Sequence, residues 1–207
     1  MIYQSGEKLK HSKAGFTLLE MMTSMSLIVI ITTIFIANYR SSNRRTDLVM
    51  TAQKLVADLH MAQNNALGLV KYGGEVPAGG WGIHFDKFEP TRYIMFADLN
   101  KPESNDPWDI YAAELGYMYY DEGEGEVDSG ARIIDLPKGV EITSLEITST
   151  DTQSNIVNVT FLPPDPKTNI FNEIATSTFV RIGLRDAREG KTKTVRVNFL
   201  GLVEVID

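Results

Sequence analysis

Residues 13–37 read KAGFTLLEMMTSMSLIVIITTIFIA, and this stretch decides how the first part of the chain folds. A polar segment precedes it, and the apolar run from Phe16 to Ala37 carries one charge, Glu20. An α-helix rises about 1.5 Å per residue and the hydrocarbon core of a bilayer is about 30 Å thick. The run therefore predicts a helix that is long enough to span a membrane.

The small residues that a processing peptidase prefers lie before the apolar run. An ordinary secretory signal places such a site after its apolar core, so that cleavage removes the core. Here the attractive site is Ala14-Gly15, directly ahead of Phe16. Processing at this site would leave the apolar helix in the mature chain.

The segment Lys13-Ala14-Gly15-Phe16-Thr17-Leu18-Leu19-Glu20 resembles the type III signal of type IV pilins and type II secretion pseudopilins. The resemblance implies a leader over residues 1–15, cleavage by prepilin peptidase between Gly15 and Phe16, and N-methylation of Phe16. It also implies that Glu20, the fifth residue of the mature chain, acts in assembly with other pilins or pseudopilins.

The leader contains three lysines, at positions 8, 10 and 13. Under the positive-inside rule they favour a cytoplasmic leader and an extracytoplasmic C-terminus. Arg40, Arg44 and Arg45, beyond the apolar run, weaken this preference. We therefore expect a single-pass protein of the inner or cytoplasmic membrane that is incorporated into a filament.

A carboxylate inside a membrane helix costs several kcal/mol and usually has a function. Glu20 therefore calls for a partner charge. In the family that the motif resembles, the equivalent glutamate is thought to meet the amino terminus of a neighbouring subunit. The alternative is a glutamate near a helix end whose carboxylate snorkels to the membrane surface.

Helical periodicity continues beyond the membrane segment. Neither Gly nor Pro interrupts residues 16–67, and apolar residues recur at spacings of three and four, while Lys54 and Asp58 fall elsewhere around the helix. We expect one helix over 16–69, with a transmembrane part (16–37) and an amphipathic part (38–69) that packs on the following domain rather than in a coiled coil. The stripe comprises Leu48, Ala52, Leu55, Leu59, Ala62, Ala66 and Leu69.

After residue 69 the pattern changes to period-two alternation punctuated by glycine pairs, which predicts strands. The fold class expected is α+β, with the long N-terminal helix packed on an antiparallel, β-sandwich-like domain over residues 70–207. The expected strands are 82–86, 93–97, 116–120, 131–136, 141–147, 156–161, 178–184, 193–199 and 202–206, the last two forming a hairpin.

This second part is similar to the minor pseudopilin group that contains the H subunit of type II secretion and the FimT-type minor pilins. The similarity implies a structural subunit that initiates or caps a pilus-like filament in type II secretion or type IV pilus assembly. Its elements, in chain order, are the helix segment 55–67, Gly82-Ile83-His84-Phe85, Tyr93-Ile94-Met95-Phe96-Ala97-Asp98, Leu136-Pro137-Lys138-Gly139-Val140, Val159-Thr160-Phe161-Leu162-Pro163-Pro164 and residues 195–205.

The composition argues against most other chemistry. The chain has no cysteine, which excludes disulfides, thiol catalysis and cysteine-ligated metals. Neither a Gly-x-Ser-x-Gly elbow nor a phosphate loop is present, and His11, His60 and His84 are far apart. We therefore predict no enzyme, no cofactor and no metal centre.

Two acidic loops raise a calcium hypothesis, but neither has the full spacing of a calcium loop. Solvated surface loops are the favoured interpretation. The first loop contains Asp98, Asn100, Asn105, Asp106 and Asp109, and the second contains Asp121, Glu122, Glu124, Glu126 and Asp128.

Nucleic acid is an unfavoured partner, because 20 basic residues face 27 acidic ones and the formal net charge is −7. The alternative function nevertheless kept open is a DNA-binding minor pilin for DNA uptake. It rests on a locally basic stretch near the C-terminus, which Asp186 and Glu189 dilute. The stretch contains Arg181, Arg185, Arg188, Lys191, Lys193 and Arg196.

Overall fold

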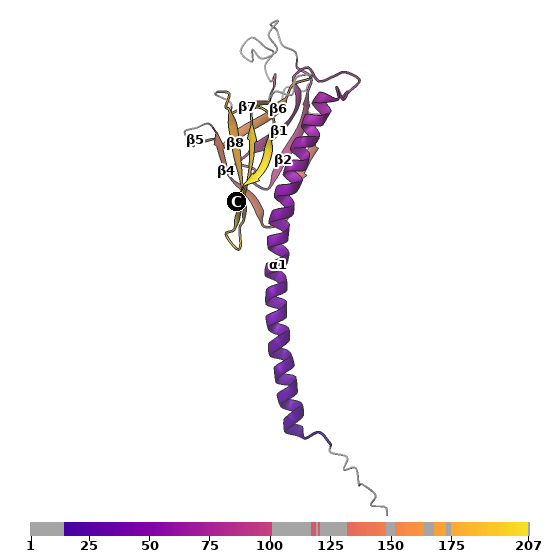
Figure 1. Ribbon diagram of the computed structural model, residues 1–207, viewed down its shortest axis with the longest axis vertical. Helices are drawn as coiled ribbons and strands as arrows, with labels where there is room; N and C mark the ends of the chain where they lie inside the picture. The colour runs from indigo at the N-terminus through magenta and orange to yellow at the C-terminus, as the bar shows by residue number, and fades with distance from the viewer. Residues whose placement is uncertain are drawn as a thin grey trace, which may run out of the picture. The chain divides into compact units, whose positions relative to one another are not determined.

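The computed structural model describes residues 15–100, 117–118, 120, 132–147, 152–163, 168–172 and 175–206, with the side chains of 37–45 and 152 left out of the description (Figure 1). The chain divides into two compact units, 1–42 and 43–207. Each unit is described by itself.

One long helix, α1 (Leu18–Leu67), contains 50 residues and contributes to both units. It ends in a Schellman motif, in which the Val70 N–H donates to Asn65 O (2.9 Å) and the Leu69 N–H donates to Ala66 O (3.1 Å). Leu69 takes the left-handed conformation (φ 51°) that closes this motif. The single helix expected from the sequence is confirmed, although Leu69 itself lies beyond its end.

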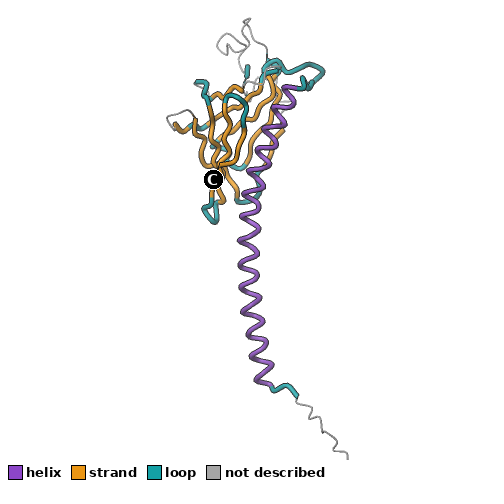
Figure 2. Tube along the Cα trace, in the orientation of Figure 1, coloured by secondary structure: helices purple, strands orange, loops and turns teal. Residues whose placement is uncertain are grey.

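The strands form two antiparallel sheets in the second unit (Figure 2). Sheet I has the order β3-β2-β1-β6-β7 and sheet II the order β10-β9-β8-β4-β5. The strands of sheet I are β1 (Gly80–Asp86), β2 (Arg92–Asp98), β3 (Arg132–Asp135), β6 (Ile156–Phe161) and β7 (Thr168–Phe171). Those of sheet II are β4 (Val140–Ile147), β5 (Thr152–Gln153), β8 (Phe179–Asp186), β9 (Thr192–Asn198) and β10 (Val203–Ile206).

The α+β fold class is therefore confirmed, and eight of the nine expected strands lie within two residues of an observed one. The strand expected at 116–120 is wrong, because residues 117 and 118 form a turn. Met118 has φ 65°, a left-handed value that no continuous strand contains. The strands β5 and β7 were not predicted.

The C-terminal part of α1 packs into one core with both sheets, and Figure 1 shows it beside β2. The core joins the helix stripe to Ile83 and Val159 of sheet I and to Leu145 and Val195 of sheet II. The predicted stripe is correct except at Leu69, which is 47% exposed. The other members, Leu48, Ala52, Leu55, Leu59, Ala62 and Ala66, are at most 2% exposed.

Candidate functional site

The first turn of α1 is capped by Thr17. The Glu20 N–H donates to Thr17 Oγ1 (3.2 Å), and the Met21 N–H donates to the Thr17 carbonyl (3.2 Å). Threonine at the N-cap with glutamate three residues later is the sequence pattern of a capping box. Gly15 and Phe16, the residues of the predicted cleavage site, precede this cap in a non-helical and exposed stretch.

The segment Leu18–Ile36 of α1 is apolar and long enough, at 19 residues, to cross a membrane. All of its side chains are exposed within the chain, in contrast to an ordinary core helix, whose apolar side chains would be buried. The length and composition expected of the transmembrane segment are thus present.

Hydroxyl groups in this segment bond back to their own helix. Serine and threonine side chains commonly donate to carbonyls three or four residues earlier, which removes their need for another partner. The five bonds are Thr23 to Glu20 O (3.0 Å), Ser24 to Glu20 O (2.7 Å), Ser26 to Met22 O (2.9 Å), Thr32 to Ile28 O (2.7 Å) and Thr33 to Val29 O (2.8 Å).

Glu20 is the one charged residue in 15–36. Its position in the first helical turn is favourable, since the positive end of the helix dipole lies there. Within the described residues no basic side chain forms an ion pair with it. The hydroxyl groups of the segment already donate to carbonyls of their own helix. The Glu20 carboxylate is therefore the polar side-chain group of the segment that requires a partner.

A second acidic residue of α1, Asp58, does have partners within the chain. The Tyr93 hydroxyl donates to Asp58 Oδ2 (2.6 Å), and Arg132 Nη2 donates to Oδ1 (3.2 Å). Asp58 lies outside the apolar stripe, as the sequence indicated, but it is only 7% exposed. Burial first, and then the hydrogen bond to Asp58 and its negative charge, raise the pKa of Tyr93 far above its ordinary range.

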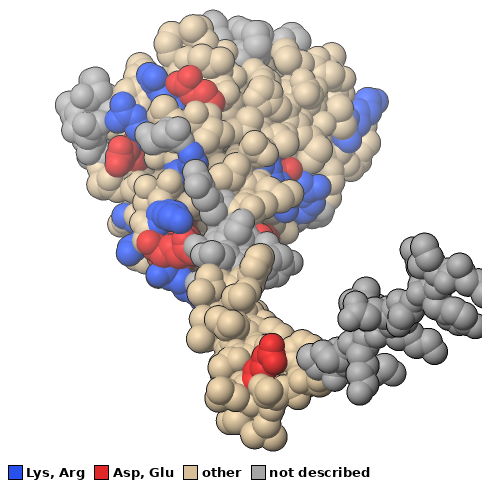
Figure 3. Space-filling view, turned by 60° about the horizontal axis from the view of Figure 1, so that its bottom comes forward, with Lys and Arg blue, Asp and Glu red and all other residues tan. Residues whose placement is uncertain are grey.

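Two members of the basic stretch near the C-terminus, Arg181 and Arg196, lie in a cross-strand row on sheet II. Arg181 of β8 and Arg196 of β9 are direct neighbours, and Glu146 and Glu204 flank them at 3.7 Å and 3.4 Å. Both guanidinium groups lie over the Phe179 ring, 5.1 and 5.2 Å from its centroid. Figure 3 shows basic and acidic side chains side by side on this domain. The charges of the row therefore balance.

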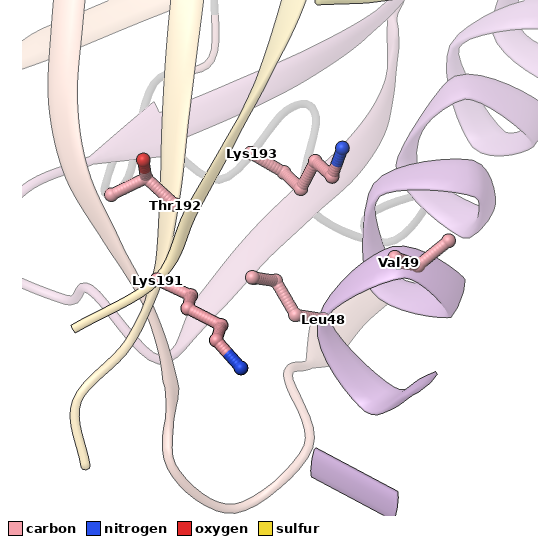
Figure 4. A pocket seen from close by; sticks show the side chains of 5 residues that line it. All are labelled: Leu48, Val49, Lys191, Thr192 and Lys193. Atoms are coloured by element: carbon pink, nitrogen blue, oxygen red, sulfur yellow. The ribbon is translucent and has the colours of Figure 1, made fainter. Parts of the chain in front are cut away.

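A cavity of about 400 Å³ opens between α1 and the start of β9 (Figure 4). Leu48 and Val49 of the helix line one side, and Lys191, Thr192 and Lys193 line the other. The Lys191 ammonium also pairs with Glu189 (2.7 Å). The lining combines no nucleophile with a general base, so this cavity supports no catalytic assignment.

Of the proposed calcium ligands, Asp98 and Asn100 are described. Asp98 is fully buried, and its carboxylate accepts the backbone N–H groups of Asn100 (2.8 Å) and Met118 (2.5 Å). Both carboxylate oxygens of Asp98 therefore hold backbone N–H groups in place. The remaining candidates, Asn105, Asp106, Asp109, Asp121, Glu122, Glu124, Glu126 and Asp128, lie outside the described residues.

The histidines are not brought together in the described part of the chain. His60 is exposed on α1, whereas His84 Nδ1 is 2.8 Å from Asn158 Oδ1 on sheet I. His11 lies outside the described residues. Among the described residues, no group of three or more His, Asp or Glu side chains is arranged to hold a metal ion.

Sequence reasoning missed two features of the site. The Thr17 cap had a readable signal, Thr-x-x-Glu directly before an apolar run. The Asp58 network had none, because its partners are 35 and 74 positions away along the chain.

Comparison with known proteins identifies one match. The prokaryotic N-terminal methylation motif matches residues 10–36, which contain the Thr17 cap, Glu20 and the exposed apolar segment. No curated protein and no solved structure matches the chain. The motif supports a type IV pilin-like protein, processed by prepilin peptidase and assembled with other pilins, and it points to a structural subunit rather than an enzyme.

Proposed function

We propose that this protein is a minor pseudopilin or minor type IV pilin, a structural subunit at the initiation point or tip of a pilus-like filament. It would serve in type II protein secretion or type IV pilus assembly. The observation that carries the proposal is the coincidence of the methylation motif at 10–36 with an apolar helix whose side chains have no partners in the described chain. A structural subunit that anchors in a membrane and then packs among other pilins needs such a helix.

In the proposed sequence of events, residues 1–15 are a leader that prepilin peptidase removes between Gly15 and Phe16. The new amino group of Phe16 is then methylated. Residues 16–37 hold the chain in the membrane, while residues 38–69 and the β domain (70–207) lie on the extracytoplasmic side. The exposed, non-helical stretch around Gly15 supports this order, because a peptidase needs access to the bond it cuts.

Glu20 is proposed to pair with the amino terminus of a neighbouring subunit during assembly. Two charges at about 4 Å attract far more strongly in an apolar medium than in water. An unpaired carboxylate and an unpaired ammonium group are each destabilising in an apolar environment. An ion pair between them therefore lowers the free energy of both. The absence of an ion-pair partner for Glu20 within the described residues supports this role.

The DNA-uptake alternative receives no support from Arg181 and Arg196 of sheet II. DNA binding depends on cations that are available to phosphates. Arg181 and Arg196 lie instead beside Glu146 and Glu204. A salt-dependent DNA affinity of residues 44–207 would reverse this ranking.

The test of the proposed function is the mature N-terminus. In cells that contain prepilin peptidase, mass spectrometry should find a chain that begins at Phe16 and carries one N-methyl group. Gly15→Val should retain the leader, because a branched side chain replaces the small residue at the cut, whereas Ala57→Val, which introduces the same side chain at an exposed position of α1, is a control that should be processed normally. A mature chain beginning at Met1, or one cut after residue 37, would contradict the assignment.

A further inference from the structure

We propose that Thr17 is a positioning residue for leader cleavage, because its N-cap holds the Gly15–Phe16 peptide bond outside the helix. The inference rests on the proposed function, since it presupposes that prepilin peptidase cuts this bond. It assigns a role in processing to Thr17, which is not one of the two residues of the cleavage site.

The geometry at the start of α1 carries the argument. An N-cap residue has non-helical backbone angles while its side chain accepts an N–H of the first turn. Thr17 Oγ1 accepts the Glu20 N–H (3.2 Å), and the helix begins at Leu18. The scissile bond therefore lies two residues before the first helical residue, with Phe16 75% exposed.

The cap at Thr17 opposes a tendency of α1 to extend towards its N-terminus. In an apolar environment, a free backbone N–H or C=O is costly, which favours extension of a helix over fraying. Adding residues to an existing helix is also far easier than nucleating one. Without the cap, α1 would extend backwards through Phe16, and the Gly15–Phe16 bond would enter the helix.

A helical scissile bond is a poor substrate. Its carbonyl group accepts an intrahelical hydrogen bond from the Leu19 N–H, and the first turn of the helix shields it from an active site. Gly15 opposes helix formation as well, since glycine costs about 1 kcal/mol relative to alanine in a helix. The hydrogen bond that the Thr17 hydroxyl accepts fixes the start of the helix at Leu18.

The experiment uses the full-length chain in membranes with prepilin peptidase and compares cleavage rates of Thr17 variants. Thr17→Val keeps the shape of the side chain but cannot cap, whereas Thr17→Ser and Thr17→Asn keep an acceptor oxygen. Thr17→Val should be cleaved about fivefold more slowly, which is the ~1 kcal/mol of a lost cap converted at tenfold per ~1.36 kcal/mol. Serine and asparagine should restore a rate near that of the wild type.

Hydrogen exchange supplies a second readout. If α1 extends through Phe16 in Thr17→Val, the Leu19 amide acquires the Gly15 carbonyl as an acceptor and should gain protection, while the Glu20 amide exchanges the Thr17 hydroxyl for the Phe16 carbonyl and should stay protected. Thr17→Ser and Thr17→Asn should leave both amides as in the wild type.

The outcomes separate this inference from the proposed function. If the wild type is cleaved after Gly15 and the two variants Thr17→Val and Thr17→Ser are cleaved at equal rates, the inference is overturned and the proposed function stands. If Ser is processed but Asn fails like Val, the peptidase reads the hydroxyl itself and the positioning role is also overturned. If the wild type is never cut after Gly15, the proposed function fails and the inference fails with it.

Discussion

The two halves of α1 have the same backbone conformation but opposite side-chain environments. In residues 18–36 every side chain is exposed within the chain, whereas the stripe from Leu48 to Ala66 is buried in a core that both sheets share. The second half is stabilised by its own domain. The first half obtains comparable burial only from a lipid or protein environment supplied from outside the described residues.

The acidic residues of the two halves follow the same division. Asp58 has a hydroxyl and a guanidinium partner within its domain. Glu20 has no ion-pair partner among the described residues. A buried or membrane-embedded carboxylate needs compensation in either case. The comparison indicates that interactions of the second half build the subunit, while those of the first half are available for assembly.

The most drastic way to test this division is to remove the first half. A chain that begins at Arg44 should be a soluble monomer, because it loses the continuous apolar surface of residues 16–36 and keeps the shared core. Size-exclusion chromatography with light scattering measures this directly. Persistent oligomers of the shortened chain would place assembly in the sheet domain instead.

Replacing Glu20 should impair assembly without impairing insertion. Removing a charge from a membrane helix eases insertion by about 2.5–3.5 kcal/mol on translocon scales. The amine of the neighbouring subunit then loses its counter-charge, at a cost of roughly 3–5 kcal/mol in a buried setting. Glu20→Ala should therefore be inserted and cleaved but crosslink poorly to other pilins, through single cysteines introduced into this cysteine-free chain.

The variant Glu20→Gln separates charge from helix capping. Glutamine preserves the capping-box pattern with Thr17 but carries no charge. If the charge matters, Glu20→Gln should crosslink as poorly as Glu20→Ala. Wild-type crosslinking of both variants would remove any assembly role from this carboxylate.

Truncations of leucine and isoleucine in the two halves should differ in their effect on folding. Leu55 is 0% exposed, so Leu55→Ala should lower the free energy of unfolding by about 2–5 kcal/mol. Ile28 is 62% exposed, and Ile28→Ala should leave the unfolding of the β domain unchanged. Urea titration of the full-length chain in detergent, followed by the fluorescence of its two tryptophans, Trp81 and Trp108, compares the two. Equal effects would mean that the halves are not energetically distinct.

The smallest of these effects is expected at Asp58. Asp58→Ala leaves the buried Tyr93 hydroxyl without its acceptor, which should cost about 1–3 kcal/mol of unfolding free energy. Arg132 is 55% exposed in its side chain and can return to water, so it adds little. In the double variant Asp58→Ala with Tyr93→Phe, part of the loss should be recovered. A double variant as unstable as the sum of the single ones would argue against the coupling.

Local and periodic features were readable from the sequence because their causes are local. The apolar run, the absence of Gly and Pro in α1, and the stripe positions determine a helix and its buried face. Period-two alternation located most strands in the same way. The cap at Thr17 was equally local, since its signal lies within four residues.

Features that depend on distant residues were not readable. Helical periodicity places Asp58 outside the apolar stripe and does not predict its burial, because its partners Tyr93 and Arg132 are connected to it by no local pattern. The turn at Met118 is similar. An apolar, aromatic stretch suggested a strand there, but Met118 donates its N–H to Asp98 and accepts from Thr160, and these contacts select a left-handed conformation.

The five hydroxyl bonds within residues 20–33 make the hydroxyl groups of the apolar segment independent of partners outside the helix. A side chain that hydrogen-bonds to water or to a neighbour has to exchange that partner whenever the helix moves. Thr32 and Thr33 keep the same carbonyl acceptors wherever the helix lies. A transfer of the segment from a bilayer into a protein assembly would therefore break none of these five hydrogen bonds, and Glu20 would be the side chain of the segment whose polar partner changes.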